Sequence, residues 1–358
     1  MNDLSRRVFH RILIIKPSSF GDVIHALPVL NGLRQRFPQA HIAWLVSTAC
    51  AGLLEGHPQL DEVIPFDRKR FGRLGRSLAV TVEFARFVRG LHARRFDLVL
   101  DLQGLFRSGF LSLASGARVR IGFAKAREFG WLFYSHPIRV PGGDLHAVDR
   151  YYLFARPLGF ADAPIRFELP IDPGARAAVE RMLVEGGIGP GGRYALLGAG
   201  TRWETKRWPT ESFAELARTI RQRFDLSVVL AGASDEVEVA GRVAAQAGPG
   251  VINLAGRTSV PQMAALVAGA AVVVMNDTGP MHLAVALDRP LIALFGPTNP
   301  LRTGPYRQAD SVCRLDLPCS PCYLKRLADC PYAHRCLREL SPAAVADRVA
   351  AVLARGER

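Results

Sequence analysis

Hydrophobic positions along the chain fall into two patterns, short apolar runs and longer stretches in which apolar residues recur every three or four positions. The runs are typical of buried parallel strands and the stretches of amphipathic helices. In the first half, strands are predicted at 11–16, 41–46, 63–66, 97–102 and 119–123, and helices at 23–37, 75–92, from 104 and at 146–158. This alternation is typical of an α/β domain.

The alternation restarts after residues 162–174, whose three prolines forbid a long helix and favour a linker. Strands are then predicted at 194–197, 226–230, 251–254, 271–275 and 291–295, and helices from 175 and at 210–224, 235–246, 260–268, 280–287 and 341–353. We therefore expect an α/β fold of two Rossmann-like domains facing a cleft. The expected boundaries are 1–172 for the first domain, 173–335 for the second and 336–358 for a C-terminal helix.

One segment, 272–298, combines an apolar strand, a polar turn and a short helix. Ligands of doubly wound sheets bind where strands end, and free N–H groups at a helix start favour anions. The backbone N–H groups of Asp277, Thr278 and Gly279 are therefore candidates for a diphosphate site. A plain helix cap, contributing roughly 1 kcal/mol, explains the turn equally well when it is taken alone.

Size and hydropathy limit the class of protein. A chain of 358 residues with 49% hydrophobic content is long enough for two cores. No run of 18 apolar residues occurs, and residues 1–10 lack the apolar core of a signal peptide. A cytoplasmic protein without a membrane-spanning segment is expected.

The formal net charge of +14 is concentrated in places: between Arg68 and Arg95, nine Lys or Arg residues accompany a single acid, Glu83. Such a patch favours a polyanion, whether nucleic acid, anionic lipid or a phosphorylated glycan, and a solvated arginine-rich face is the simpler alternative. No RNA-binding signature accompanies it, so nucleic acid is not the expected partner.

Two Rossmann-like halves suit a dehydrogenase, a periplasmic-type binding protein or a two-domain glycosyltransferase. The loop after the first strand, KPSSFGD, has one glycine and cannot supply G-x-G-x-x-G. The missing signal peptide weakens the second class.

Four segments together decide between the classes. They are KPSSFGDVIHALPVL (16–30), GTRWETKRWP (200–209), AGASDE (231–236) and NDTGPMHLAVALDRPLIALFGPT (276–298). In this order they resemble the lipopolysaccharide heptosyltransferases of glycosyltransferase family 9, most strongly the type that adds the first heptose to the inner core. The resemblance implies the GT-B fold, an inverting transfer that needs no metal, an ADP-heptose in the C-terminal half and a glycolipid in the N-terminal half. In agreement, no aspartate is followed by another two positions later, so no D-x-D metal clamp exists.

Asp22 is the expected catalytic residue. A carboxylate beside the acceptor hydroxyl takes its proton as the sugar centre is attacked from the face opposite ADP, and the resemblance assigns this position the general-base role. The competing interpretation is that Asp22 only caps a helix.

The remaining expected site residues fall into two groups. Nucleotide-sugar binding is assigned to Thr201, Lys206, Glu236, Thr258, Asp277, Thr278, Gly279 and His282. Acceptor binding is assigned to Lys16, Ser18, Ser19, Arg68, Arg70 and Arg73. Asp235 is an immediate rival of Glu236 for the ribose hydroxyls.

The expected function is transfer of heptose from ADP-L-glycero-D-manno-heptose to Kdo-lipid A by an enzyme peripherally associated with the cytoplasmic face of the inner membrane, without a catalytic cofactor. Two alternatives stay open at this point. One is another nucleotide sugar used on an anionic glycan, and the other is a non-catalytic nucleotide-sugar-binding protein.

Cysteines crowd the end of the chain: Cys313, Cys319, Cys322, Cys330 and Cys336, with His334 nearby, whereas Cys50 lies apart. Because disulfides are rare in the cytosol, this cluster suggests a structural zinc, although its spacing matches no standard zinc module. Reduced thiols are the alternative.

Overall fold

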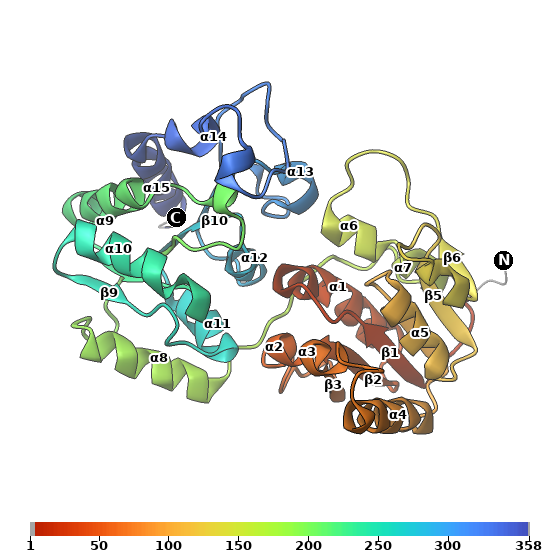
Figure 1. Ribbon diagram of the computed structural model, residues 1–358. Coiled ribbons are helices and arrows are strands. Elements are labelled where there is room, and N and C mark those ends of the chain that lie inside the picture. The colour runs from red at the N-terminus through yellow and green to blue at the C-terminus, as the bar shows by residue number, and fades with distance from the viewer. Residues whose placement is uncertain (1–3, 357–358) are drawn as a thin grey trace. The chain divides into compact units, whose positions relative to one another are not determined.

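The computed structural model describes residues 4–356, and the chain divides between Pro170 and Ile171 into two compact units (Figure 1). The division lies inside the proline-rich stretch, two residues before the expected boundary. The last helix, α15 (Pro342–Gly356), packs on α9 (Thr210–Phe224) and contributes Val345 and Val349 to the core of the second unit. It is therefore part of that unit.

The first unit is a six-stranded parallel sheet in the order β3-β2-β1-β4-β5-β6. Its strands are β1 Arg11–Ile15, β2 His41–Ser47, β3 Glu62–Phe66, β4 Leu98–Asp101, β5 Val119–Phe123 and β6 His136–Ile138. Its helices are α1 Phe20–Arg36, α2 Thr48–Ala51, α3 Arg68–Phe71, α4 Leu78–Ala93, α5 Phe106–Ala114, α6 Ala147–Tyr152 and α7 Ala155–Leu158, with the 3₁₀ turn η1 Gly130–Phe133.

The second unit repeats the arrangement with the strand order β12-β11-β10-β7-β8-β9. Its strands are β7 Tyr194–Gly198, β8 Ser227–Leu230, β9 Val251–Asn253, β10 Val272–Asn276, β11 Leu291–Leu294 and β12 Val312–Cys313. Besides α9 and α15 it contains the helices α8 Pro173–Glu185, α10 Val237–Ala247, α11 Val260–Gly269, α12 Gly279–Ala286, α13 Pro300–Thr303 and α14 Arg335–Arg338. Four 3₁₀ turns complete it, η2 Glu204–Lys206, η3 Ser234–Glu236, η4 Ala309–Ser311 and η5 Leu327–Asp329.

Both strand orders reverse direction once, between β1 and β4 in the first sheet and between β7 and β10 in the second. At such a switch point the loops that follow the two strands run to opposite faces of the sheet and leave a crevice in which ligands bind. The crevice of each unit therefore lies among the loops after these strands.

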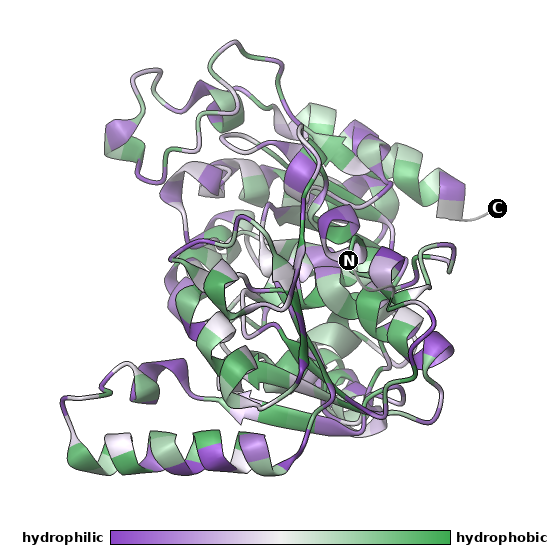
Figure 2. Cartoon of the chain, turned by 90° about the vertical axis from the view of Figure 1, so that its right-hand side faces the viewer, coloured by the Kyte–Doolittle hydropathy of each residue, from purple (hydrophilic) through white to green (hydrophobic). Residues whose placement is uncertain are grey.

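The central strands are buried on both faces. Ile12–Ile15 and Val272–Val274 have no solvent exposure, which explains why they appear in the sequence as unbroken apolar runs. In Figure 2 the hydrophobic residues concentrate in the strands, whereas hydrophobic and hydrophilic residues alternate along the outer helices. Among residues 4–356, no helix combines the length and the apolar composition needed to cross a bilayer.

The expected elements differ from the structure in several places. The basic helix expected at 75–92 begins at Leu78, after the Ser77 cap, and a separate turn, α3, precedes it. The helix expected at 146–158 is two helices, α6 and α7, because Pro157 lacks the N–H that would bond to the carbonyl of Leu153. Residues 136–138, for which no strand was predicted, form the edge strand β6, where Pro137 is tolerated.

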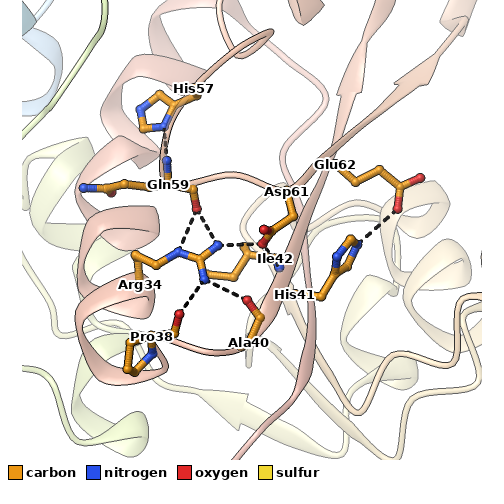
Figure 3. Close-up of polar contacts among 9 residues, drawn as sticks. All are labelled: Arg34, Pro38, Ala40, His41, Ile42, His57, Gln59, Asp61 and Glu62. Atoms are coloured by element: carbon orange, nitrogen blue, oxygen red, sulfur yellow. Dashed lines mark hydrogen bonds and ion pairs between the residues drawn. The ribbon is translucent and has the colours of Figure 1, made fainter.

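An arginine connects α1 with the segments that lead into β2 and β3 (Figure 3). The Arg34 guanidinium, near the end of α1, donates to the carbonyls of Gln59, Pro38 and Ala40 and to Asp61 Oδ2 at 2.6 Å. Asp61 also accepts from the N–H of Ile42 at 2.7 Å. These bonds fasten the end of α1 to the starts of β2 and β3.

Candidate active site

Asp22 lies in the first turn of α1, directly after β1, where a loop was expected. Ser19 is the N-cap of the helix. The Asp22 carboxylate accepts from the Ser19 N–H at 3.0 Å and from the Ser19 hydroxyl at 2.7 Å, both at Oδ2. Asp22 therefore closes a capping box at the helix start, and its capping role is real.

Its second oxygen has other partners. The Tyr151 hydroxyl donates to Asp22 Oδ1 at 2.8 Å, and the Lys16 ammonium lies 3.9 Å from the same oxygen and 4.8 Å from the centre of the Tyr151 ring. Lys16 and Tyr151 are buried, whereas the Asp22 side chain is 34% exposed. A carboxylate oxygen accepts about two hydrogen bonds, so Oδ1 keeps one position for an incoming hydroxyl.

The electrostatics of this cluster keep Asp22 ionised. Burial alone would raise the pKa of the Asp22 carboxyl, but the cation of Lys16, then His25, and the hydrogen bonds from Ser19 outweigh it and hold the pKa well below its usual range. Burial and the neighbouring Asp22 charge raise the pKa of the Tyr151 phenol well above 10, so Tyr151 stays a hydrogen-bond donor. At neutral pH Asp22 is thus a carboxylate whose Oδ2 accepts from Ser19 and whose Oδ1 accepts from Tyr151 and keeps one lone pair for a further donor.

The residues expected to bind the acceptor divide according to their partners. Arg68 lies beside the site, because its guanidinium donates to the Ser18 hydroxyl at 2.7 Å. Arg70 is paired with Glu83 at 2.5 Å, whereas Arg73 is exposed. Lys16 and Ser19, which were expected to face the acceptor, are instead engaged with Asp22. Arg68 and Arg73 are therefore the members of this set best placed for an anionic ligand.

In the second unit, Asp277 follows β10 and carries the expected diphosphate turn. The Lys206 ammonium, after β7, lies 2.6 Å from Asp277 Oδ2, and the Thr298 hydroxyl, after β11, donates to the same oxygen at 2.7 Å. Lys206 also lies 4.6 Å from the centre of the Trp203 indole ring. Loops from three neighbouring strands thus meet on one carboxylate at the switch point.

A buried amide sets this geometry. Asn276 has no solvent exposure, and its Oδ1 accepts from the Trp208 N–H at 3.1 Å while its Nδ2 donates to the Ala199 carbonyl at 2.8 Å. The loop after β7 is thereby tied to the end of β10. Removing either partner would leave buried polar groups unsatisfied, so the separation of Lys206 and Asp277 is firmly fixed.

At the start of α12, one of the three expected phosphate donors has another role. The N–H of Asp277 donates to the Leu294 carbonyl at 3.2 Å as part of the sheet, so it does not face a ligand. Thr278 is the N-cap and its side chain makes no capping bond, which leaves the N–H groups of Thr278 and Gly279 as the candidate phosphate donors. His282 is buried one turn further along.

Glu236 lies in the first turn after β8 and folds back over the loops on either side. It accepts from the Ala233 N–H at 2.9 Å, and a Cβ atom added at Gly200 would overlap its side chain. Burial raises the pKa of the Glu236 carboxyl, and the neighbouring Asp235 charge adds to this. Because Asp235 itself is exposed, Glu236 is the acid that faces the crevice side of this turn.

Two threonines of the expected set have different surroundings. Thr201 shapes its own loop, because its hydroxyl accepts from the Trp203 N–H at 3.2 Å. The Thr258 hydroxyl, in the loop after β9, is buried and has no hydrogen-bond partner within residues 4–356. Thr258 therefore keeps both its donor and its acceptor available, whereas Thr201 acts chiefly on loop geometry.

The structural zinc expected at the cysteines stays a prediction. All six are free thiols, and residues 4–356 contain no group of three or more His, Cys, Asp or Glu side chains arranged to hold a metal ion. Burial, followed by the nearby Cys322, Cys330 and Cys319, raises the pKa of the Cys336 thiol to about 11. His334 is engaged elsewhere, with its Nε2 2.7 Å from the Thr205 carbonyl oxygen.

The two doubly wound sheets, with polar loops gathered at each switch point, define a two-domain α/β protein with a ligand-binding crevice in each unit. The sequence profile of glycosyltransferase family 9 (heptosyltransferase) matches residues 84–331. The chain belongs to glycosyltransferase family 9 and is a glycosyltransferase.

Named relatives agree with this assignment. The chain is 37% identical to lipopolysaccharide heptosyltransferase 1 of Pseudomonas aeruginosa over 88% of this chain and 86% of that protein. It is 34% identical to lipopolysaccharide heptosyltransferase 1 of Escherichia coli K12, over 85% and 93%. Identity to lipopolysaccharide heptosyltransferase 2 of Salmonella typhimurium is lower, 29% over 85% and 88%.

Solved structures agree as well. The E. coli heptosyltransferase WaaC with ADP-2-deoxy-2-fluoro heptose superimposes with a TM-score of 0.73 and 31% identity, covering 95% of this chain and 99% of that one. E. coli ADP-heptose lps heptosyltransferase II gives a TM-score of 0.76 at 26% identity, covering 97% and 100%. The GT-B fold expected from the sequence is confirmed.

Several residues of these clusters escaped the analysis of the sequence. Tyr151, in α6, lies 129 positions from Asp22, and Thr298 lies 21 positions from Asp277. No local pattern links such pairs. For Thr298, the available signal was its place at the end of a segment that resembles the family.

Proposed function

We propose that the protein transfers heptose from ADP-heptose to the Kdo-lipid A inner core of lipopolysaccharide, with inversion. The observation that carries the proposal is the Asp22 cluster: an ionised, partly exposed carboxylate at a switch point, in a chain 37% identical to a lipopolysaccharide heptosyltransferase 1. Identity to heptosyltransferase 1 proteins exceeds that to the type 2 protein, which favours addition of the first heptose.

In the proposed reaction Asp22 acts as general base. The acceptor hydroxyl donates to the open position on Oδ1, its oxygen bonds to the anomeric carbon of heptose, and the bond from that carbon to the ADP oxygen breaks. The proton passes to Asp22, and ADP leaves with the electron pair of the broken bond. Tyr151 and Ser19 hold the carboxylate in position, so little reorganisation accompanies the transfer.

The donor is proposed to bind in the second unit. Lys206, released in part from Asp277, neutralises the leaving diphosphate, and the N–H groups of Thr278 and Gly279 donate to the phosphate oxygens. Asp277 then accepts from heptose hydroxyls, and Glu236 from the ribose. We propose that these groups meet the charge without a metal ion, in keeping with the missing D-x-D motif.

The acceptor is proposed to bind in the first unit, on the side of Ser18, Arg68 and Arg73, from the cytoplasmic face of the inner membrane. Exposed guanidinium groups suit the phosphates and carboxylates of a lipid-linked core. Their attraction is screened by salt, so raising the ionic strength is expected to increase the KM of the acceptor more than that of the donor. Equal sensitivity of the two would count against this assignment.

The test is incubation with ADP-heptose and Kdo-lipid A, followed by mass spectrometry for the addition of a single heptose, with UDP- and GDP-sugars as competitors. Transfer from ADP-heptose, and from none of the other nucleotide sugars, supports the proposal. Transfer from another nucleotide sugar supports the broader family activity. Donor binding without any transfer would point to a non-catalytic binding protein.

A further inference from the structure

An exposed apolar surface lies in the first unit outside the groups assigned above. It consists of Phe106, Phe129, Trp131 and Leu132, which are 50%, 68%, 45% and 61% exposed, and is called the aromatic rim below. Large apolar side chains gathered at such exposure mark an interaction surface more often than chance. The aromatic rim is therefore a candidate for contact with a partner.

The backbone beneath the aromatic rim is closely packed. A Cβ atom at Gly109 of α5 would lie 2.6 Å from the Phe133 ring and 2.8 Å from the Gly130 carbonyl oxygen, so only glycine lets η1 approach α5 this closely. The rings of Phe106 and Phe133 meet edge to face, with centroids 5.2 Å apart. The rim is thus a rigid projection on the start of α5.

Phe129 is held outward at a conformational cost. Glu128 and Phe129 have φ of 54° and 59°, in the left-handed region. Non-glycine residues occupy this region at a cost of roughly 1–2 kcal/mol each. Burial of the Phe129 ring within the unit does not offset that cost, because the ring is mostly exposed. A partner that covers the Phe129 ring would offset this conformational cost.

Three basic side chains and one acidic side chain, Glu128, flank the aromatic rim. Arg107 follows Phe106, and Lys125 and Arg127 precede Phe129; all three are exposed, and within residues 4–356 none of them forms an ion pair. Aromatic rings flanked by unpaired cations match the interface of an anionic bilayer, where rings sit at the headgroup level and cations meet lipid phosphates. A protein partner would instead require a matching acidic surface.

The rim also lies at the same edge of the sheet as Asp22. The rim segments follow β4 and β5, and Asp22 follows β1, so all leave the carboxyl edge of one parallel sheet. Arg127 is close enough to Lys16 to affect it: burial lowers the pKa of the Lys16 ammonium, and the Arg150 and Arg127 cations lower it further against the opposing effect of Asp22. A membrane contacting the rim would therefore lie beside the proposed acceptor site.

We infer that the aromatic rim is a membrane-docking surface that inserts Phe129, Trp131 and Leu132 into the headgroup region of an anionic leaflet. The inference rests on the proposed function, because a lipid-linked acceptor gives the enzyme a reason to approach a bilayer. To the proposed function, the inference adds the residues that contact the membrane. Docking would present the Asp22 edge to acceptors anchored in that same leaflet.

The test is co-sedimentation of the full chain with phosphatidylglycerol–phosphatidylcholine vesicles, using pure phosphatidylcholine vesicles for comparison. The double variant Phe129→Ser/Leu132→Ser is expected to lose about ten-fold or more in partitioning to anionic vesicles. The matched control Val184→Ser/Leu301→Ser changes two side chains of similar exposure, 51% and 67%, in the second unit. It is expected to partition like the wild type.

Trp131 supplies a direct readout, because it is the most exposed of the four tryptophans: Trp44 and Trp208 are buried, and Trp203 in the second unit is only partly exposed. Its fluorescence is expected to shift to shorter wavelength when anionic vesicles are added, and Trp131→Phe is expected to remove the shift. Unchanged partitioning of the rim variant, or a shift that persists in Trp131→Phe, would overturn the inference. The inference would also be overturned if the control variant Val184→Ser/Leu301→Ser lost as much partitioning to anionic vesicles as the rim variant.

A soluble, deacylated acceptor separates the two proposals. The rim variant is expected to keep wild-type kcat on this acceptor and to lose turnover only on acceptor embedded in vesicles. If the wild type fails to glycosylate the soluble acceptor, the proposed function fails, whatever the vesicles show. If the rim variant loses turnover on the soluble acceptor while its thermal unfolding matches that of the wild type, the rim contacts substrate directly and the docking inference fails.

Discussion

The Lys206–Asp277 pair offers a quantitative test of the donor site. The Asp277 side chain is 6% exposed and the Lys206 side chain 17%, with 2.6 Å between Nζ and Oδ2. Breaking a fully buried pair by removing one partner costs about 3–5 kcal/mol, because the remaining charge is left uncompensated. Within residues 4–356, Lys206→Met leaves the Asp277 carboxylate with only the Thr298 hydroxyl, so we expect the free energy of unfolding to fall by an amount near the lower end, about 3 kcal/mol.

Asp277→Asn is expected to lower the free energy of unfolding by less, about 1–2 kcal/mol, because the unpaired Lys206 ammonium reaches water more easily than an unpaired Asp277 carboxylate does. The double variant removes both charges and is expected to cost no more than Lys206→Met alone. The coupling energy of the double-mutant cycle should then be about 1–2 kcal/mol. Because the chain has two units, hydrogen exchange of peptides covering 194–206 and 272–298 is the measurement that isolates this region.

The same variants report on function. Lys206→Met is expected to weaken ADP-heptose binding in calorimetry by ten-fold or more, since the diphosphate loses its main cation. Trp208 and Asn276 fix the loop independently of Lys206, so the variant should keep the rest of the loop in place. Additive stability losses, with coupling under about 0.5 kcal/mol, would refute the pairing argument. Unchanged donor affinity would refute the proposed role of Lys206.

Three further changes test other parts of the site. Asp22→Asn is expected to lower kcat by about a thousand-fold or more while calorimetry still detects ADP-heptose binding, and a variant with substantial turnover would remove Asp22 from the mechanism. Tyr151→Phe deletes one charge-assisted hydrogen bond worth about 1.5–3 kcal/mol, so kcat should fall about ten-fold or more with the donor KM unchanged. A rise in the donor KM as large as the fall in kcat would assign Tyr151 to binding. Gly200→Ala displaces the Glu236 side chain and should raise the donor KM, whereas Gly241→Ala, whose added Cβ meets nothing within 4 Å, serves as the control and should leave it unchanged.

The pH dependence of stability follows from the low pKa of Asp22. Its folded-state pKa lies below the unfolded value of 3.8, so the ionised form stabilises the fold above that value, and this contribution is lost as the pH falls through the folded pKa. Wild-type stability should therefore decline more steeply than that of Asp22→Asn in acid below about pH 4. Parallel curves for the two proteins would show that Asp22 does not gain its stabilising partners in the folded state.

The alternation of apolar runs and amphipathic stretches was sufficient to predict two α/β units and most of their strands. Strands such as 12–15 and 272–274 are apolar at every position because both faces of each sheet are covered, and this pattern is local in the sequence. Helix ends were predicted less well. The start of α1 depends on the Ser19–Asp22 capping box, and the break between α6 and α7 depends on a single proline.

The site residues also divide into those that the sequence predicted and those that only the structure identified. Resemblance to the family identified Asp22, Lys206 and Asp277, because each lies in a short segment that can be compared residue by residue. Only the tertiary structure showed that Tyr151 donates to Asp22, that the Asp277 N–H belongs to the sheet, and that Lys206 pairs with Asp277 across 71 positions. The sequence determined which residues end each strand. The strand order decided which of those ends became neighbours, because pairing in a parallel sheet joins segments whose contacts leave no periodic trace along the chain.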